Sequence, residues 1–166
     1  ARAERVITDN NRIELKDAIQ GKIAHSLERQ VGDFVVKRAD GYFAYQLAAV
    51  VDDADQGITD IVRGADLLDS TTRQIYLQQL LGYTTPRYAH LPVAVNVLGE
   101  KLSKQTLAAP IDAGDPLATL NPVLAFLGQD MISDADPKKM ADFWKRAIAG
   151  WNLARVPRQR TQPAPV

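Results

Sequence analysis

Two stretches of the sequence carry residues that can bind an anionic ligand, and the first centres on an arginine. Arg63 ends the strand-like run of residues 58–63, and Gly64 follows it. A guanidinium at the end of a strand can hold a carboxylate through two parallel hydrogen bonds, and the glycine lets a ligand approach the backbone closely. The alternative is a structural ion pair between Arg63 and the carboxylate of Asp66 or Asp69.

The second stretch places two lysines on a loop. Residues 99–105 read Gly-Glu-Lys-Leu-Ser-Lys-Gln, with Ser103 between Lys101 and Lys104. Lysines in this arrangement can place ammonium charges on a polyphosphate, because each is a point charge on a flexible stem. The alternative is an ordinary basic turn on the surface.

Tyr45 is a third candidate, because its hydroxyl can meet a ligand in the same crevice as Arg63. A tyrosine of the core, with its hydroxyl satisfied, is the alternative. His25 and His90 stand apart from any further ligand pattern, so the sequence predicts no metal site. It also lacks a nucleophile elbow and a glycine-rich phosphate loop.

The elements that must position these residues alternate between strand and helix. Runs of β-branched residues predict strands, and apolar residues at helical spacing predict helices between them. In chain order these are a strand over 33–38, a helix over 43–55, a strand over 58–63, a helix capped by Ser70 or Thr71 and ended by Gly82, and a strand over 91–97. The alternation predicts an α/β fold with a parallel sheet, in which ligands bind at the carboxyl ends of strands.

The first thirty residues predict short strands and turns. Ile13 and Leu15 alternate with charged residues, and Gly21 can form a hairpin turn. An irregular surface segment is the alternative for this part of the chain.

The last third of the chain predicts helices. One covers residues 116–127 and the other covers 137–153. The second carries a continuous apolar stripe that we expect to be core. The stripe consists of Met140, Phe143, Trp144, Ala147, Ile148 and Trp151. Three prolines after residue 155 predict a loose tail.

Composition excludes several classes of protein. The 166 residues include 20 Lys and Arg, 20 Asp and Glu, and no cysteine. A formal charge of zero excludes a strongly basic protein that coats nucleic acid. The missing cysteines exclude a disulfide scaffold, a cysteine-ligated zinc site and a thiol nucleophile within this chain. No apolar stretch approaches the roughly 20 residues that cross a bilayer, so we expect no membrane partner.

The zero net charge hides an uneven distribution. Residues 52–69 contain six aspartates and one basic residue, whereas residues 138–166 contain seven lysines or arginines and one aspartate. Five of those basic residues can meet the phosphates of an RNA, and a solvated helix face is the alternative. They are Lys138, Lys139, Lys145, Arg146 and Arg155.

Five ordered blocks of the sequence resemble one family. Their order and spacing are similar to those of the glutamyl-tRNA synthetase group of class I aminoacyl-tRNA synthetases from about residue 33 to residue 105, and more loosely from residue 13 to residue 151. The blocks are residues 41–53, 57–66, 72–77, 90–92 and 101–104.

The resemblance implies a fold and a set of ligands. The fold is the second half of a Rossmann-type parallel sheet, followed by a small helical region. Tyr45 and Arg63 would contact glutamate, with Arg63 near its side-chain carboxylate. Lys101, Ser103 and Lys104 would contact ATP, which binds with Mg²⁺. The two lysines would be catalytic, because residues 101–105 correspond to the K-M-S-K-S loop of the family.

The resemblance also divides the chain. Residues 1–32 would end an inserted connective region, residues 33–109 would form the carboxyl-terminal half of the nucleotide-binding domain, residues 110–155 would form a helical region that contacts a tRNA stem, and residues 156–166 would be a disordered tail.

The residues in these blocks are most similar to those of the short branch of the group. Members of that branch attach glutamate to the queuosine base in the anticodon loop of tRNA(Asp). Only a short segment follows Lys104, and Ala49 stands where full-length members often have asparagine. A truncated glutamyl-tRNA synthetase and a non-catalytic tRNA-binding module are the alternatives.

Two signatures of the family are missing from this sequence. The H-I-G-H-like motif and the zinc-binding cysteines lie upstream of the matching region in the family. We therefore expect this chain to be the carboxyl-terminal part of a cytoplasmic, monomeric ligase, with any zinc ligands outside it. Alone, the 166 residues are expected to be unable to form glutamyl-adenylate.

Overall fold

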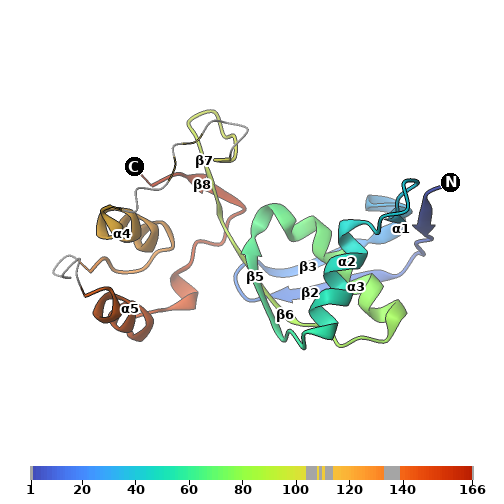
Figure 1. Ribbon diagram of the computed structural model, residues 1–166, viewed down its shortest axis with the longest axis horizontal. Helices are drawn as coiled ribbons and strands as arrows, with labels where there is room; N and C mark the ends of the chain where they lie inside the picture. The colour runs from blue at the N-terminus through green and yellow to red at the C-terminus, as the bar shows by residue number, and fades with distance from the viewer. Residues whose placement is uncertain (1, 104–107, 109, 111–113, 133–138, 166) are drawn as a thin grey trace. The chain divides into compact units, whose positions relative to one another are not determined.

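The computed structural model describes residues 2–103, 108, 110, 114–132 and 139–165 (Figure 1). The chain forms two compact units, Ala1–His90 and Leu91–Val166. The boundary between them falls inside the segment 33–109 that was expected to belong to one domain.

A β-hairpin forms one side of the first unit. Strand β2 (Arg12–Asp17) pairs antiparallel with β3 (Gly21–Ser26), which confirms the predicted hairpin. The side chains of β2 alternate strictly between exposed and buried, with Ile13, Leu15 and Asp17 on the buried face. This alternation follows from the two-residue period of a strand, and it aims a carboxylate at the core.

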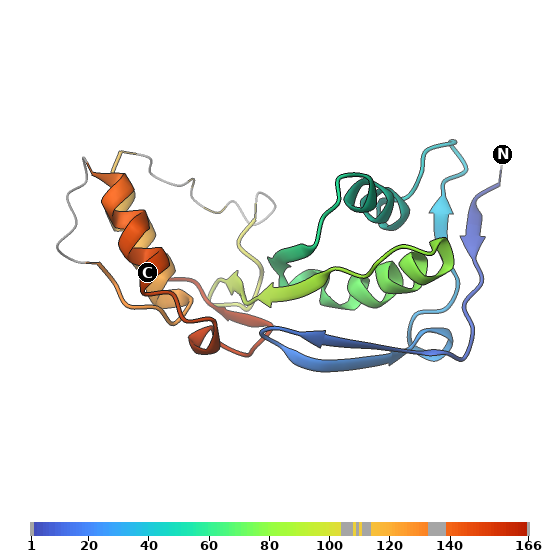
Figure 2. The same cartoon turned by 90° about the horizontal axis from the view of Figure 1, so that it is seen from below.

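Helix α3 (Leu68–Leu81) packs against this hairpin, and Figure 2 shows the two lying side by side. The core between them contains Ile13, Leu15, Leu27, Leu68, Ile75, Tyr76 and Tyr88. Gly82 ends the helix in the left-handed conformation, with φ of 72°, as its position predicts.

The predicted start of α3 was wrong. The helix begins at Leu68, directly after the 3₁₀ turn η1 (Ala65–Leu67), and its N-cap residue Leu67 makes no side-chain cap. The Thr71 hydroxyl lies inside the first turn, 3.2 Å from the Leu67 carbonyl oxygen to which it donates. A threonine preceding an apolar run therefore did not mark the helix start.

Two neighbouring strands carry the central part of the unit. Strand β5 (Asp60–Gly64) is paired with β6 (Arg87–Leu91), and α3 connects them. Their arrows point the same way in Figure 2, as expected of a strand–helix–strand unit. Helix α2 (Tyr45–Asp55) packs against α3 and confirms the helix predicted over residues 43–55.

The strand predicted over residues 91–97, with Pro92 at its edge or entry, is confirmed only after Pro92, and the strand before Pro92 was not predicted. The chain forms β6 and then β7 (Val93–Val95), and Pro92 separates them. Proline has no N–H to donate to a sheet ladder, which explains why the apolar run is divided at this residue.

The strand predicted over residues 33–38 is present as β4 (Phe34–Lys37), but its partner differs from the prediction. It pairs antiparallel with β1 (Glu4–Val6) rather than joining a parallel sheet. The short helix α1 (Leu27–Gln30) links the hairpin to this pair. The fold remains α/β, with helices alternating between strands as expected.

In the second unit the tail expected to be loose forms a strand. Strand β8 (Thr161–Pro163) pairs parallel with β7, and the Ala164 amide donates to the Val95 carbonyl oxygen at 2.9 Å. A 3₁₀ turn η2 (Leu153–Arg155) precedes it, and Val156 is only 5% exposed. The prediction failed because proline content reports local preference, whereas β7 supplies a partner from far away in the sequence.

Two helices complete the second unit, α4 (Pro116–Phe126) and α5 (Met140–Ala149). The Asp115 side chain caps α4 by accepting from the Ala118 amide. The expected core stripe on α5 was partly wrong. Phe143 is fully buried against Leu124 and Ile132, but Trp144, Ile148 and Trp151 are 48%, 74% and 41% exposed. The apolar stripe predicted on α5 is therefore wider than the part of that helix that is buried against α4.

Among the described helices, none combines the length and the apolar character that crossing a bilayer requires.

Gly128 follows α4 where the second unit leaves no space for a side chain. Its φ is 71°, and a Cβ atom there would lie 2.2 Å from the Arg155 carbonyl oxygen. Gly128→Ala is expected to lower the free energy of unfolding by more than the roughly 1–3 kcal/mol of a strained backbone alone. Urea denaturation measures this loss.

Gly99→Ala is the matched control for that substitution. Gly99 has a similar φ of 79°, but a Cβ there meets no described atom within 4 Å. The control therefore isolates the conformational strain. Equal losses for the two variants would show that the backbone of Arg155 moves away at little cost.

Candidate active site

Arg63 lies near the end of β5, half-buried between α3 and β6. Its Nε donates to the His90 Nε2 at 3.1 Å. Its Nη2 donates to the Thr71 hydroxyl at 2.8 Å and to the Gln74 Oε1 at 2.7 Å. The guanidinium also lies 5.4 Å from the centre of the Tyr88 ring, in the range of a cation–π contact.

These contacts use three of the five N–H groups of the guanidinium. Within the described residues, Nη1 has no partner, and it is not a buried atom. The acceptors that these contacts reach are uncharged: an imidazole nitrogen, a hydroxyl and an amide oxygen. Arg63 therefore combines a fixed orientation, uncharged acceptors and two available donors, which suits the binding of a carboxylate.

His90 and Asp17 lie behind Arg63 in the core. The His90 Nδ1 and the Asp17 Oδ2 are 2.7 Å apart, and both side chains are fully buried. Burial lowers the pKa of His90, and the opposing effect of Asp17 does not overcome it. Burial alone would raise the pKa of Asp17, but hydrogen bonds from His90, Gln20 and Ile19 outweigh burial and lower it. At neutral pH the pair is a neutral imidazole and a carboxylate.

Tyr45 occupies the first position of α2. Its side chain is 57% exposed, so the alternative that it belongs to the core is wrong. Within the described part of the chain its hydroxyl has no hydrogen bond, and no contact joins it to Arg63. The structure leaves this hydroxyl available to a ligand.

Lys101 follows a tight turn in the second unit. The Asn96 Oδ1 accepts hydrogen bonds from the Leu98 and Glu100 amides, and Gly99 takes a positive φ of 79°. Lys101 then forms a β-bridge with Val95 and is exposed. Ser103 is half-buried. Lys104 and Gln105, the rest of the predicted phosphate loop, lie outside the described residues.

The basic residues predicted to face RNA differ in their surroundings. Arg155 makes a two-pronged ion pair with Asp130, at 2.8 and 2.7 Å, so its charge is already compensated. Lys139, Lys145 and Arg146 are exposed. Lys138 lies outside the described residues.

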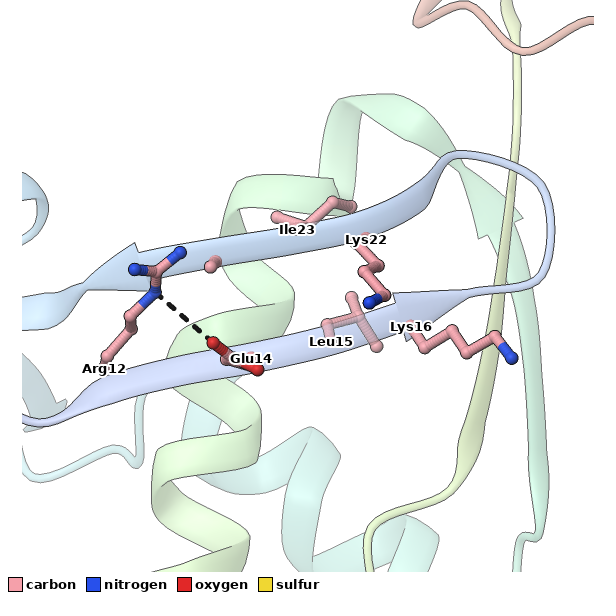
Figure 3. Close-up of a pocket in the computed structure, with 7 residues that line it drawn as sticks. Arg12, Glu14, Leu15, Lys16, Lys22 and Ile23 are labelled. Carbon is pink, nitrogen blue, oxygen red and sulfur yellow. Dashed lines mark ion pairs between the residues drawn. The ribbon is translucent and has the colours of Figure 1, made fainter.

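A depression lies on the outer face of the hairpin. It measures about 650 Å³, and Figure 3 shows Lys16, Lys22 and the Arg12–Glu14 ion pair around it. None of the sequence-predicted site residues lines this depression. The described residues also contain no cluster of three or more His, Cys, Asp or Glu side chains placed to hold a metal ion.

The residues around Arg63 were not singled out as a site from the sequence. Asp17 had a visible signal, because it continues the Ile13 and Leu15 alternation and places a charge where an apolar residue belongs. His90 had a similar one, because it alternates with Tyr88 on the buried face of β6. The sequence gives no signal that would mark Thr71 and Gln74 as part of the site, because polar residues are common on helices.

Comparisons with known proteins agree on one family. Residues 3–126 match the family model described as tRNA synthetases class I (E and Q), catalytic domain. The Glutamyl-Q tRNA(Asp) synthetase of Aromatoleum aromaticum is 57% identical over 156 residues, which cover 94% of this chain and 50% of that protein. The protein of the same name from Dechloromonas aromatica is 53% identical over 159 residues, which cover 96% of this chain and 53% of that protein. This chain thus spans about half the length of these curated relatives.

A solved structure shows the same fold. The glutamate-tRNA synthetase of Elizabethkingia anophelis superposes with a TM-score of 0.68 and 25% sequence identity, over 92% of this chain and 34% of that one. The similarity supports the α/β class expected from the alternation of strands and helices.

Proposed function

The chain belongs to the class I tRNA synthetases of the E and Q catalytic-domain family, and from this premise we propose that the protein containing it activates glutamate with ATP and transfers it to the queuosine base of tRNA(Asp). The observation that carries the proposal is the Arg63 guanidinium, which is held by uncharged acceptors and keeps Nη1 available to an anion.

Arg63 is proposed to bind the side-chain carboxylate of glutamate. A cation held by uncharged acceptors gains most from a carboxylate and far less from the neutral amide of glutamine. The exposed hydroxyl of Tyr45 is proposed to contact the same amino acid. The α-carboxylate of glutamate then stays available for reaction.

Activation joins that α-carboxylate to ATP. A carboxylate oxygen attacks the α-phosphorus, the bond from this phosphorus to the bridging oxygen breaks, and pyrophosphate leaves with its electron pair. A nucleophile of the tRNA then displaces AMP from the acyl carbon. Mg²⁺ bound with ATP would neutralise part of the phosphate charge.

Lys101, Ser103 and Lys104 are proposed to contact the phosphates of ATP. Ammonium groups stabilise the charge that develops on the α-phosphate and on the departing pyrophosphate, and they need no covalent step. Lys101 is exposed directly after a tight turn, which supports this role.

The proposal is tested with the full polypeptide that contains this chain. It is expected to catalyse ATP–pyrophosphate exchange that depends on glutamate, that fails with glutamine and that needs no tRNA. Exchange that requires tRNA would instead favour a glutamyl-tRNA synthetase, and no exchange under any condition would favour a tRNA-binding module. The 166-residue chain alone is expected to show no exchange.

The acceptor is tested separately with labelled glutamate. Label is expected on tRNA(Asp) that carries queuosine and not on the same tRNA with guanosine in that position. Label at the 3′ end of another tRNA would contradict the proposed acceptor.

A further inference from the structure

A continuous chain of hydrogen bonds runs from a buried carboxylate to the proposed glutamate-binding arginine. It links Asp17 on β2 to His90 on β6 at 2.7 Å, and His90 to Arg63 on β5 at 3.1 Å. The Asp17 Oδ1 is itself fixed by the amides of Ile19, Gln20 and His90. The carboxylate is therefore anchored in the backbone of the hairpin, while the far end of the chain is the ligand-facing arginine.

The chemistry of arginine settles the tautomer of His90. The Arg63 Nε always carries a proton, so the His90 Nε2 that it contacts must accept. The proton of the neutral ring then lies on Nδ1 and is donated to the Asp17 Oδ2. Each contact supports the next, because a carboxylate that pulls on the Nδ1 proton makes Nε2 a better acceptor.

The charged groups near this ring are few. Asp17 faces it from β2, Arg63 from β5, and Asp66 acts on it from the turn η1. The Tyr88 ring stacks on His90 with 6.0 Å between centres and 13° between planes. A full positive charge on His90 would face the Arg63 guanidinium directly, whereas the neutral ring accepts a hydrogen bond from it.

We propose that Asp17 and His90 are positioning residues, which fix the Arg63 guanidinium so that Nη1 alone is presented to the side-chain carboxylate of glutamate. This inference rests on the proposed function. Arginine has a long, flexible side chain, and fixing it before the ligand arrives reduces the ordering cost of binding. Thr71 and Gln74 on α3 accept hydrogen bonds from the Arg63 Nη2, and His90 on β6 accepts one from the Arg63 Nε.

Two amide substitutions of the histidine separate the contacts of its two ring nitrogens. Nδ1 contacts Asp17, whereas Nε2 contacts Arg63 and, at 3.1 Å, the Thr71 hydroxyl. A glutamine side chain reaches as far as the imidazole Nε2, so His90→Gln can keep the acceptor for Arg63. An asparagine side chain reaches only as far as Nδ1, so His90→Asn can keep the contact with Asp17 but loses the one with Arg63. Both variants bury an amide at the same position, and each is the control for the other.

The inference predicts a split in the kinetics of the full polypeptide. His90→Asn is expected to raise the KM for glutamate about 10- to 100-fold, as the loss of a hydrogen bond to a charged group implies. The kcat and the KM for ATP should change much less. His90→Gln keeps an acceptor for Arg63 but loses the Asp17 contact, so its KM for glutamate should rise by a clearly smaller factor than that of His90→Asn. An unchanged KM for glutamate in His90→Asn, or equal rises in the two variants, would overturn the inference.

A second measurement does not depend on activity or on the folding of the His90 variants. Nitrogen-15 NMR of the histidine rings in this chain is expected to show His90 as the neutral tautomer protonated on Nδ1 at pH 7. His25→Gln assigns the signals, since the chain has two histidines. A ring protonated on Nε2 would overturn the inference. If the wild-type polypeptide shows no glutamate-dependent exchange, the proposed function is contradicted. The NMR measurement does not depend on that exchange, so the two failures can be distinguished.

Discussion

Replacement of Arg63 by lysine is expected to raise the KM for glutamate about 100-fold in ATP–pyrophosphate exchange by the full polypeptide. Lysine keeps the charge, but one ammonium group cannot meet His90, Thr71 and Gln74 together and still face a ligand. Gln74 is only 2% exposed, so its carbonyl oxygen would lose a partner that water does not replace. The measurement is a titration of glutamate at saturating ATP.

Arg87→Lys is the matched control for this prediction. Arg87 starts the neighbouring strand β6 and pairs with Asp60 at 2.6 Å in an exposed position. Its substitution alters an arginine–carboxylate contact of the same unit without touching the proposed pocket, and little change in KM is expected. Equal effects of the two substitutions would show that Arg63 contributes to folding and not to recognition of glutamate.

Truncation of Phe143 to alanine is expected to lower the free energy of unfolding of the second unit by about 3–5 kcal/mol. Phe143 is fully buried between α4 and α5, where it contacts Leu124 and Ile132. That cluster is small, so the vacated space has few neighbours that can fill it. Urea denaturation of the 166-residue chain measures the loss.

The adjacent Trp144 provides the control, because it lies on the same helix and is 48% exposed. Trp144→Ala removes more atoms than Phe143→Ala does, but much of the tryptophan surface already contacts water. The loss is therefore expected to be clearly smaller. A greater loss for Trp144→Ala would mean that its exposed face is packed against another part of the protein in solution.

The sequence predicted the elements of this fold better than their partners. Helix α2, the turn at Gly82 and the β2–β3 hairpin have local causes, namely apolar spacing and a glycine at positive φ. The partners of β4 and β8 have no local cause, because a short strand carries no mark of the strand it will join. For that reason β4 was assigned to the wrong pairing and β8 was taken for a loose tail.

The candidate site shows a similar division. Arg63 was identified from its place after a strand, and the choice between an ion pair and an available cation needed the contacts of its guanidinium. The buried carboxylate of Asp17 was readable as a break in an apolar alternation, but its partner His90 lies 73 residues away in the chain. The role of Lys104 stays a prediction.

The exposure of the apolar face on α5 has a consequence for spectroscopy. The chain contains two tryptophans, Trp144 and Trp151, and both belong to the second unit and are partly open to water. Tryptophan emission of this chain therefore reports on that unit alone, whereas far-ultraviolet circular dichroism reports on both. Coincident unfolding curves from the two signals would identify one cooperative transition, and separated curves would give each unit its own stability.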